Sequence, residues 1–174
     1  YSKKSSHWRS SIEPSSQNRF YDGIKDIFLN TIIAVFDNLQ TDQKNKVIEK
    51  YFIHSLSIFR RLAIHFIRED KSYWAQYLPS LYEEPKYWDD ISYYHEYWLL
   101  TRATFSNLEK PQQKSYLERL LTELDAEKEN DDEKKHAQYW VYRRLWAIKD
   151  NLNVYPKIKV FFDKWREEFK DPDP

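Results

Sequence analysis

The chain contains a single glycine, Gly23, among its 174 residues. An average protein of this length would have about twelve, because glycine makes up roughly 7% of residues. Loops that cradle phosphate groups need several glycines, since their backbone amides must approach the ligand without a Cβ atom in the way. The two-residue turns of β-hairpins also favour glycine, because they need positive φ angles. The sequence therefore excludes the common nucleotide-binding loops and disfavours an all-β fold.

The composition disfavours several further classes of function. Lys and Arg together number 28, as do Asp and Glu, so the formal net charge is zero. Proteins that bind nucleic acid through counterion release usually carry a basic excess, so we expect no nucleic-acid partner. The absence of cysteine excludes disulfides, thiolate zinc sites and cysteine nucleophiles. No apolar run approaches the ~20 residues that cross a bilayer. We therefore expect a cytoplasmic protein without cofactors or membrane contact.

Helical periodicity extends over residues 18–170. Apolar residues recur at i, i+3 and i+4, which predicts seven or eight helices joined by short turns, the first over 18–39. The helix that starts near Ser55 or Ser57 is apolar over more than half of its circumference. Such a helix is expected to lie between neighbours on both sides.

Three features predict where helices end. A short helix is expected to stop before Pro79, because proline disfavours helical geometry in the residue before it. Asp89 or Asp90 is expected to cap the long helical segment that follows. The charged run 125–135 separates two apolar patterns, and we interpret it as a solvated loop or as frayed helix ends.

The fold class that follows is all-α with antiparallel helices, since short connections favour antiparallel neighbours. Helices stacked in pairs would form an α-solenoid of the HEAT or tetratricopeptide kind. The sequence shows no clean repeat period, so an irregular helical bundle is the alternative. We divide the chain into a polar N-terminal arm or linker over 1–17, a helical domain over 18–170 and a C-terminal tail over 171–174. The first residue is not Met, and we interpret the chain as a piece of a longer protein.

One pair of residues suggests catalysis. Arg60 and His65 have the spacing found in ribonucleases of the HEPN class, where such residues hold and protonate the scissile phosphate. The simpler interpretation is that His65 lies on an apolar stripe beside Phe66 as a hydrogen-bonded core histidine. His95-Glu96 begins like a zinc-protease helix, but the position of the second histidine is Leu99. We therefore predict no catalytic residue and no metal site, with the ribonuclease as the alternative.

Aromatic residues are concentrated in the segment 73–98. Tyr and Trp concentrate at binding hot spots, because they combine a large contact area with a polar tip. Consecutive aromatic residues cannot all face one core from a helix, so some of them should be exposed or meet a partner. Burial between stacked helices is the alternative. The candidate partner-binding residues are Tyr73, Trp74, Tyr87, Trp88, Tyr93 and Tyr94, with Arg60 and Arg61 on a nearby helix.

Four groups of residues, in this order, carry a resemblance to a known family. They are Trp8 to Pro14 with Gln17-Asn18 and Tyr21 to Asp26; Ile58 to His65; Glu96 to Leu100 with Phe105, Leu108 and Gln112-Gln113; and Trp140 to Leu152 with Tyr155 to Phe169. Together they resemble the helical region that follows the NTPase core in large bacterial STAND-type NTPases, including Avs-like antiviral defence proteins.

This resemblance implies a function. The helical repeats of the family are sensor or scaffold arms that recognise a foreign protein and relay this to an ATPase and an effector. The family's Walker motifs are absent here, and no catalytic residue of the family can be placed on a position of this chain. The resemblance therefore implies a non-catalytic protein-interaction and scaffold module, whose partner is a protein or another domain of the same chain.

Overall fold

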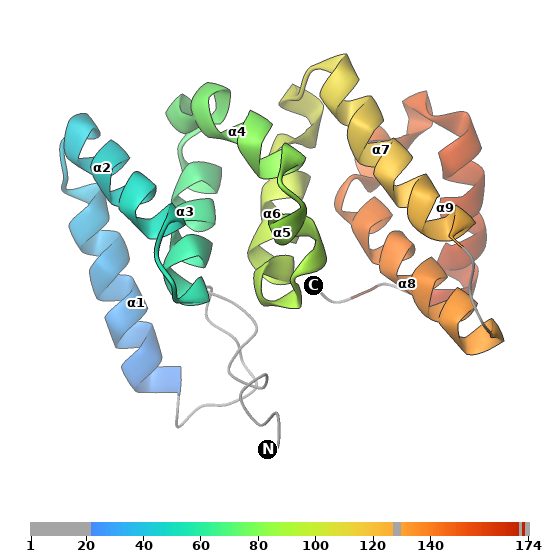
Figure 1. Ribbon diagram of the computed structural model, residues 1–174, viewed down its shortest axis with the longest axis horizontal. Coiled ribbons are helices and arrows are strands. Elements are labelled where there is room, and N and C mark those ends of the chain that lie inside the picture. The colour runs from blue at the N-terminus through green and yellow to red at the C-terminus, as the bar shows by residue number, and fades with distance from the viewer. Residues whose placement is uncertain (1–21, 127–129, 171, 173–174) are drawn as a thin grey trace.

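The structure is a computed structural model that describes residues 22–126, 130–170 and 172 (Figure 1). Over these ranges the chain is all-α, as predicted, and forms nine α-helices and four short 3-10 helices without any β-strand. The α-helices are α1 Asp22–Asp37, α2 Thr41–Phe52, α3 Ser57–Glu69, α4 Trp74–Glu83, α5 Pro85–Asp89, α6 Tyr94–Thr104, α7 Lys110–Asp125, α8 Asp131–Ala147 and α9 Pro156–Phe169. The 3-10 helices are η1 Lys71–Tyr73, η2 Ile91–Tyr93, η3 Phe105–Asn107 and η4 Lys149–Val154. The predicted arm over 1–17 and most of the 171–174 tail lie outside the described residues.

The helices follow one another along the long axis of the molecule. Helices α1 to α3 lie at one end, α4 to α6 in the middle, and α7 to α9 at the other end (Figure 1). Packing connects the groups, because α3 contacts both α2 and α6, and α8 contacts α6, α7 and α9. This arrangement agrees with the expected solenoid-like or bundle-like fold. The one core runs through all three groups.

Helix α3 lies between neighbours on several sides, as its wide apolar stripe predicted. Every residue from 61 to 67 is buried, and Leu62, Ala63 and Ile64 have no exposed surface. Seven consecutive buried residues cover nearly two turns of helix, so no side of this segment faces solvent. The contacts with α2, α4 and α6 supply the surrounding surface.

The same local motif begins α4 and α6. The side chain of Asp70 accepts a hydrogen bond from the backbone N–H of Ser72 at 2.9 Å. The side chain of Asp90 does the same for Ser92 at 2.8 Å. Each aspartate begins a 3-10 turn that continues into an α-helix, and each serine is followed by two aromatic residues. The cap predicted at Asp89 or Asp90 is therefore formed by Asp90.

The prediction that a helix stops before Pro79 is wrong. Helix α4 continues through Pro79 to Glu83. A proline inside a helix removes one backbone hydrogen bond and costs about 3 kcal/mol. Tyr77, Leu78 and Leu81 are buried on both sides of the proline, and their packing offsets this local cost. The helix contacts α7 as well as α3, which holds it in place from two sides.

The charged run 125–135, predicted as a solvated loop or as frayed helix ends, contains the end of α7 at Asp125 and the first turn of α8. Helix α8 already begins at Asp131, after Asn130, whose side chain accepts a hydrogen bond from the backbone N–H of Glu133 at 2.9 Å. The acidic residues of this first turn are stabilised by the positive end of the helix dipole. A dense run of carboxylates is therefore compatible with a helix start here.

Candidate functional site

Most of the aromatic residues in the segment 73–98 lie in the core. Tyr73, Tyr87, Trp88 and Tyr93 have only 2–4% of their surface exposed. Trp74 is half-buried and donates its indole N–H to the carbonyl of Ile67 at 2.8 Å, so it faces α3. The alternative of burial between helices is thus the correct one for these rings. Helices on both sides of the segment accommodate consecutive aromatic residues, which a single apolar face could not.

The two candidate arginines on α3 are also used inside the molecule. Arg61 is buried and forms a two-pronged ion pair with Glu96 of α6, with Nε–Oε2 and Nη2–Oε1 distances of 2.7 and 2.9 Å. Arg60 is half-buried and donates hydrogen bonds to the His54 carbonyl at 2.8 Å and to the Tyr93 hydroxyl at 2.9 Å. Both side chains therefore connect α3 to neighbouring segments instead of forming a basic edge for a partner.

Arg60 and His65 both lie on α3 but contact different groups. His65 is buried, its ring packs against Phe66, and its Nδ1 lies 3.3 Å from Nη2 of Arg68. The groups bound by Arg60 belong to other segments. Each of the two side chains thus has contacts of its own within the fold.

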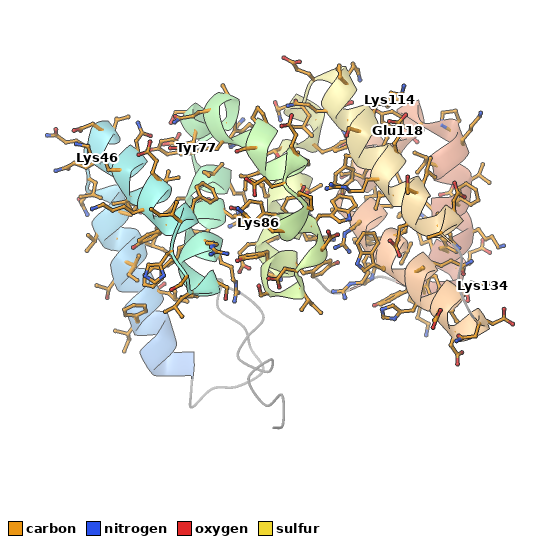
Figure 2. The ribbon with its side chains drawn as sticks, in the orientation of Figure 1. Lys46, Tyr77, Lys86, Lys114, Glu118 and Lys134 are labelled. Atoms are coloured by element: carbon orange, nitrogen blue, oxygen red, sulfur yellow. The ribbon has the colours of Figure 1, made fainter. Side chains whose placement is uncertain are left out.

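An open groove lies instead between α5, α7 and α8. It consists of two adjoining shallow cavities of about 400 and 510 Å³, both of which Glu123 lines. The first cavity is lined by Trp88, Asp89, Ser115, Glu118, Arg119, Thr122 and Glu123. The second is lined by Glu123, Asp132, Glu133, His136, Ala137 and Trp140. Figure 2 shows one of the lining residues, Glu118, on the outer side of α7 beside Lys114.

The lining residues follow from helical spacing. On α7, the polar residues at 115, 118, 119, 122 and 123 form one stripe, and the buried residues Tyr116, Leu117 and Leu120 lie on another face. On α8, Asp132, His136 and Trp140 are four residues apart and share one face. The two stripes meet because α7 packs against α8.

A stack of arginine and tryptophan side chains supports the groove from below. Arg144 of α8 is 6% exposed, and its guanidinium lies 3.4 Å from the centre of the Trp140 ring and 5.2 Å from that of Trp88. Its Nη2 donates to the Trp88 carbonyl at 2.8 Å, which ties α8 to the end of α5. Arg119 of α7 covers Trp88 at 5.2 Å. The two tryptophans that line the groove are therefore held in place by arginines from two helices.

Arg144 carries a buried charge without a carboxylate. Its Nε and Nη1 atoms have no hydrogen-bond partner among the described residues. Burial lowers the pKa of Arg144 to about 10, although Tyr116, Tyr94 and Tyr97 oppose this shift. The guanidinium remains charged at neutral pH, and cation–π contact with the surrounding rings stabilises it by about 2 kcal/mol or more at a desolvated site. These contacts fix the positions of the Trp88 and Trp140 rings beneath the groove.

Buried tyrosines lie behind the stack. Tyr97 and Tyr116 are 4–5% exposed, and burial raises the pKa of both hydroxyls. Tyr82 donates to or accepts from Thr104 at 3.0 Å, and burial raises its pKa to about 12. All three hydroxyls stay neutral at physiological pH. Their rings are part of the packing behind the stack.

Apart from Trp88, none of the residues that line the groove was predicted from the sequence as a site residue. The polar stripe of α7 and the spacing of Asp132, His136 and Trp140 were available as signals. These two signals indicate a shared surface only if α7 and α8 are neighbours, and the sequence alone does not show that they are.

Within the described ranges, no group of three or more His, Asp or Glu residues is placed to hold a metal ion. None of the helices described is both long enough and apolar enough to span a membrane. No protein-family model, curated protein or solved structure matches the chain.

Proposed function

We propose that this chain is a non-catalytic protein-interaction and scaffold module, and that the groove between α5, α7 and α8 is its contact surface. The observation that carries the proposal is the groove itself, with exposed polar residues above two tryptophans that arginines hold in place. Tryptophan and arginine are the residues most enriched at the energetic centres of protein interfaces. A surface with fixed side chains also loses little conformational entropy on binding.

The setting of the module rests on the resemblance. The chain resembles the helical arms of bacterial STAND-type NTPases, so we propose that it belongs to a larger cytoplasmic NTPase. There it would take part in recognition or signalling, including antiviral defence. Its partner would be another protein or another domain of the same chain. An NTPase core encoded upstream of Tyr1 would support this setting, and its absence from the gene would contradict it.

Site-specific photo-cross-linking in cells tests the contact surface. A photoreactive amino acid replaces Ser115, which is exposed and lines the groove, or Gln43, which is exposed on α2 at the opposite end of the molecule. We expect a distinct protein adduct from position 115 and none from position 43. Equal adducts from both positions, or none from position 115, would contradict the proposal.

A second arm addresses the ribonuclease alternative. The purified chain is incubated with RNA beside the His65→Ala variant. We expect no cleavage by either protein, because Arg60 and His65 contact different groups. Cleavage that disappears in the variant would defeat the scaffold function.

A further inference from the structure

We infer that the groove between α5, α7 and α8 binds a basic peptide segment, with the stem of a Lys or Arg side chain along the half-buried Trp140 ring and the charged ends of its basic residues at the carboxylates of the groove. This inference names the partner chemistry of the proposed interaction function and rests on that function. Charge, aromatic surface and length each support it.

The charge of the groove is one-sided. Its lining residues include five residues with a carboxylate and two basic residues, Arg119 and His136. Arg119 lies over the Trp88 ring at 5.2 Å, so its charge is directed to the base of the groove. The chain as a whole has a formal net charge of zero, so this excess is local. A complementary positive partner is attracted to such a surface, and an acidic peptide or a nucleic acid is repelled.

One carboxylate of the groove, Glu118, has a weakly held ion-pair partner. Glu118 lies 3.5 Å from Lys114 on the same helix, with both side chains largely exposed. Exposed pairs of this kind contribute little, so Glu118 can exchange Lys114 for a cation of the partner at small cost. Asp89 and Asp132 are exposed as well. Three carboxylates from three helices are therefore accessible at the groove.

The Trp140 ring suits the stem of a basic side chain. Trp140 is half-buried, and the close contact with Arg144 fixes its position. Lys and Arg have apolar stems that pack on aromatic surfaces while their charged ends stay in water. Trp88 is 4% exposed and offers only a small edge in the adjoining cavity. A basic residue placed over the Trp140 ring has carboxylates within the lining of the same cavity.

The size of the groove fits a short segment. The polar stripe of α7 extends from Ser115 to Glu123, which corresponds to about 12 Å at ~1.5 Å per helical residue. An extended peptide rises ~3.3 Å per residue, so about four residues would lie along the stripe. The cavities are open and shallow, which suits a peptide better than an enclosed small molecule.

The test measures binding of a labelled six-residue peptide containing four Lys or Arg residues, by fluorescence anisotropy at low salt. Two reference peptides carry Gln or Glu at the same four positions. The groove variant is Glu118→Gln with Asp132→Asn. The control variant, Asp42→Asn with Glu49→Gln, also removes two exposed carboxylates, one of them in the first turn of a helix, but from α2 at the other end of the molecule.

We expect the basic peptide to bind the unchanged protein more tightly than either reference peptide. The groove variant should bind it about 2- to 30-fold more weakly, as the loss of two exposed charge pairs implies, and the control variant within about twofold of the unchanged protein. The affinity should fall as salt increases, because exposed charges are screened.

Three other outcomes would overturn the inference. The first is equal weakening in both variants, which would mean that the peptide responds only to net charge. The second is equal binding of the Gln peptide. The third is no binding of the basic peptide at all. If that third result accompanies a protein adduct at position 115 in cells, the interaction function stands and only the partner chemistry is wrong. If both experiments fail, the proposed function fails with it.

Discussion

Replacement of Arg61 by Met should lower the free energy of unfolding more than almost any other single substitution. Arg61 and Glu96 form the ion pair between α3 and α6, and they are 7% and 2% exposed. The variant removes two charged hydrogen bonds of 2.7 and 2.9 Å and leaves the Glu96 carboxylate buried without its guanidinium. Breaking a buried pair in this way costs about 3–5 kcal/mol. The stability of a whole domain is only about 5–15 kcal/mol.

The same loss can be expressed as a temperature. For a domain of this size, 1 kcal/mol corresponds to a shift in Tm of about 2–4 °C, so Arg61→Met should lower Tm by about 6–20 °C. Urea unfolding followed by circular dichroism gives the free energy directly. The helix content of the folded baseline should stay unchanged, because the substitution leaves the helical propensity of α3 almost unaltered.

A double-mutant cycle separates the ion pair from the packing. Glu96→Leu alone leaves Arg61 as a buried charge, and the combination with Arg61→Met removes both charges together. Apolar replacement of a whole buried pair is often close to neutral. We therefore expect the double variant to be more stable than the sum of the two single losses by at least about 2 kcal/mol. The reasoning is refuted if Arg61→Met costs less than about 1 kcal/mol, or if the losses are simply additive.

Three further predictions concern the core, the titration of a tyrosine and the helix caps. Leu62→Ala should lower the free energy of unfolding, measured in urea, by about 2–5 kcal/mol, because Leu62 is fully buried. Leu56→Ala, at an exposed position, should lower it by less than about 0.5 kcal/mol. Equal losses would contradict the packing. Tyr82 has a folded-state pKa of about 12 against about 10 when unfolded. Its neutral hydroxyl therefore contributes to the free energy of unfolding below pH 10, and about 2–3 kcal/mol of this contribution is lost as the pH rises to 12. The unfolding free energy of Tyr82→Phe should fall less steeply over this range, and an unchanged slope would contradict the assignment. Asp90→Ala and Asp70→Ala should each lower Tm through the loss of about 1 kcal/mol per cap, and a loss at only one of them would contradict the common motif.

Local patterns in the sequence predicted the elements that depend on local physics. The wide apolar stripe of α3 predicted neighbours on several sides, and residues 61–67 are all buried. Asp90 caps its turn as its side chain and position suggested. The single glycine disfavoured an all-β fold, and no strand occurs in the part of the chain that the structure describes. In each case the deciding interaction lies within a few residues of the signal.

Predictions failed where distant segments decide the outcome. Pro79 should end a helix on local grounds, but buried residues on both sides of it keep α4 helical. Tyr87 and Tyr93 could be interface or core residues, and only the packing of α5 and η2 against other helices makes them core. Arg61 was predicted to bind a partner, but it forms an ion pair with Glu96 of α6, which is distant in the sequence. The groove depends on the pairing of α7 with α8, which a sequence without a clean repeat period does not specify.

The burial of the aromatic residues and the proposed contact surface are two aspects of one arrangement. Trp88 is 4% exposed and belongs to the core, yet its small accessible edge lines the groove. Its ring packs on Tyr116 at 4.8 Å and on Trp140 at 5.5 Å, so α5, α7 and α8 meet at one residue. A partner that touches this edge therefore meets side chains whose positions the core has already fixed. Less conformational entropy remains to be lost on binding, so a shallow groove can bind a short segment specifically without closing around it.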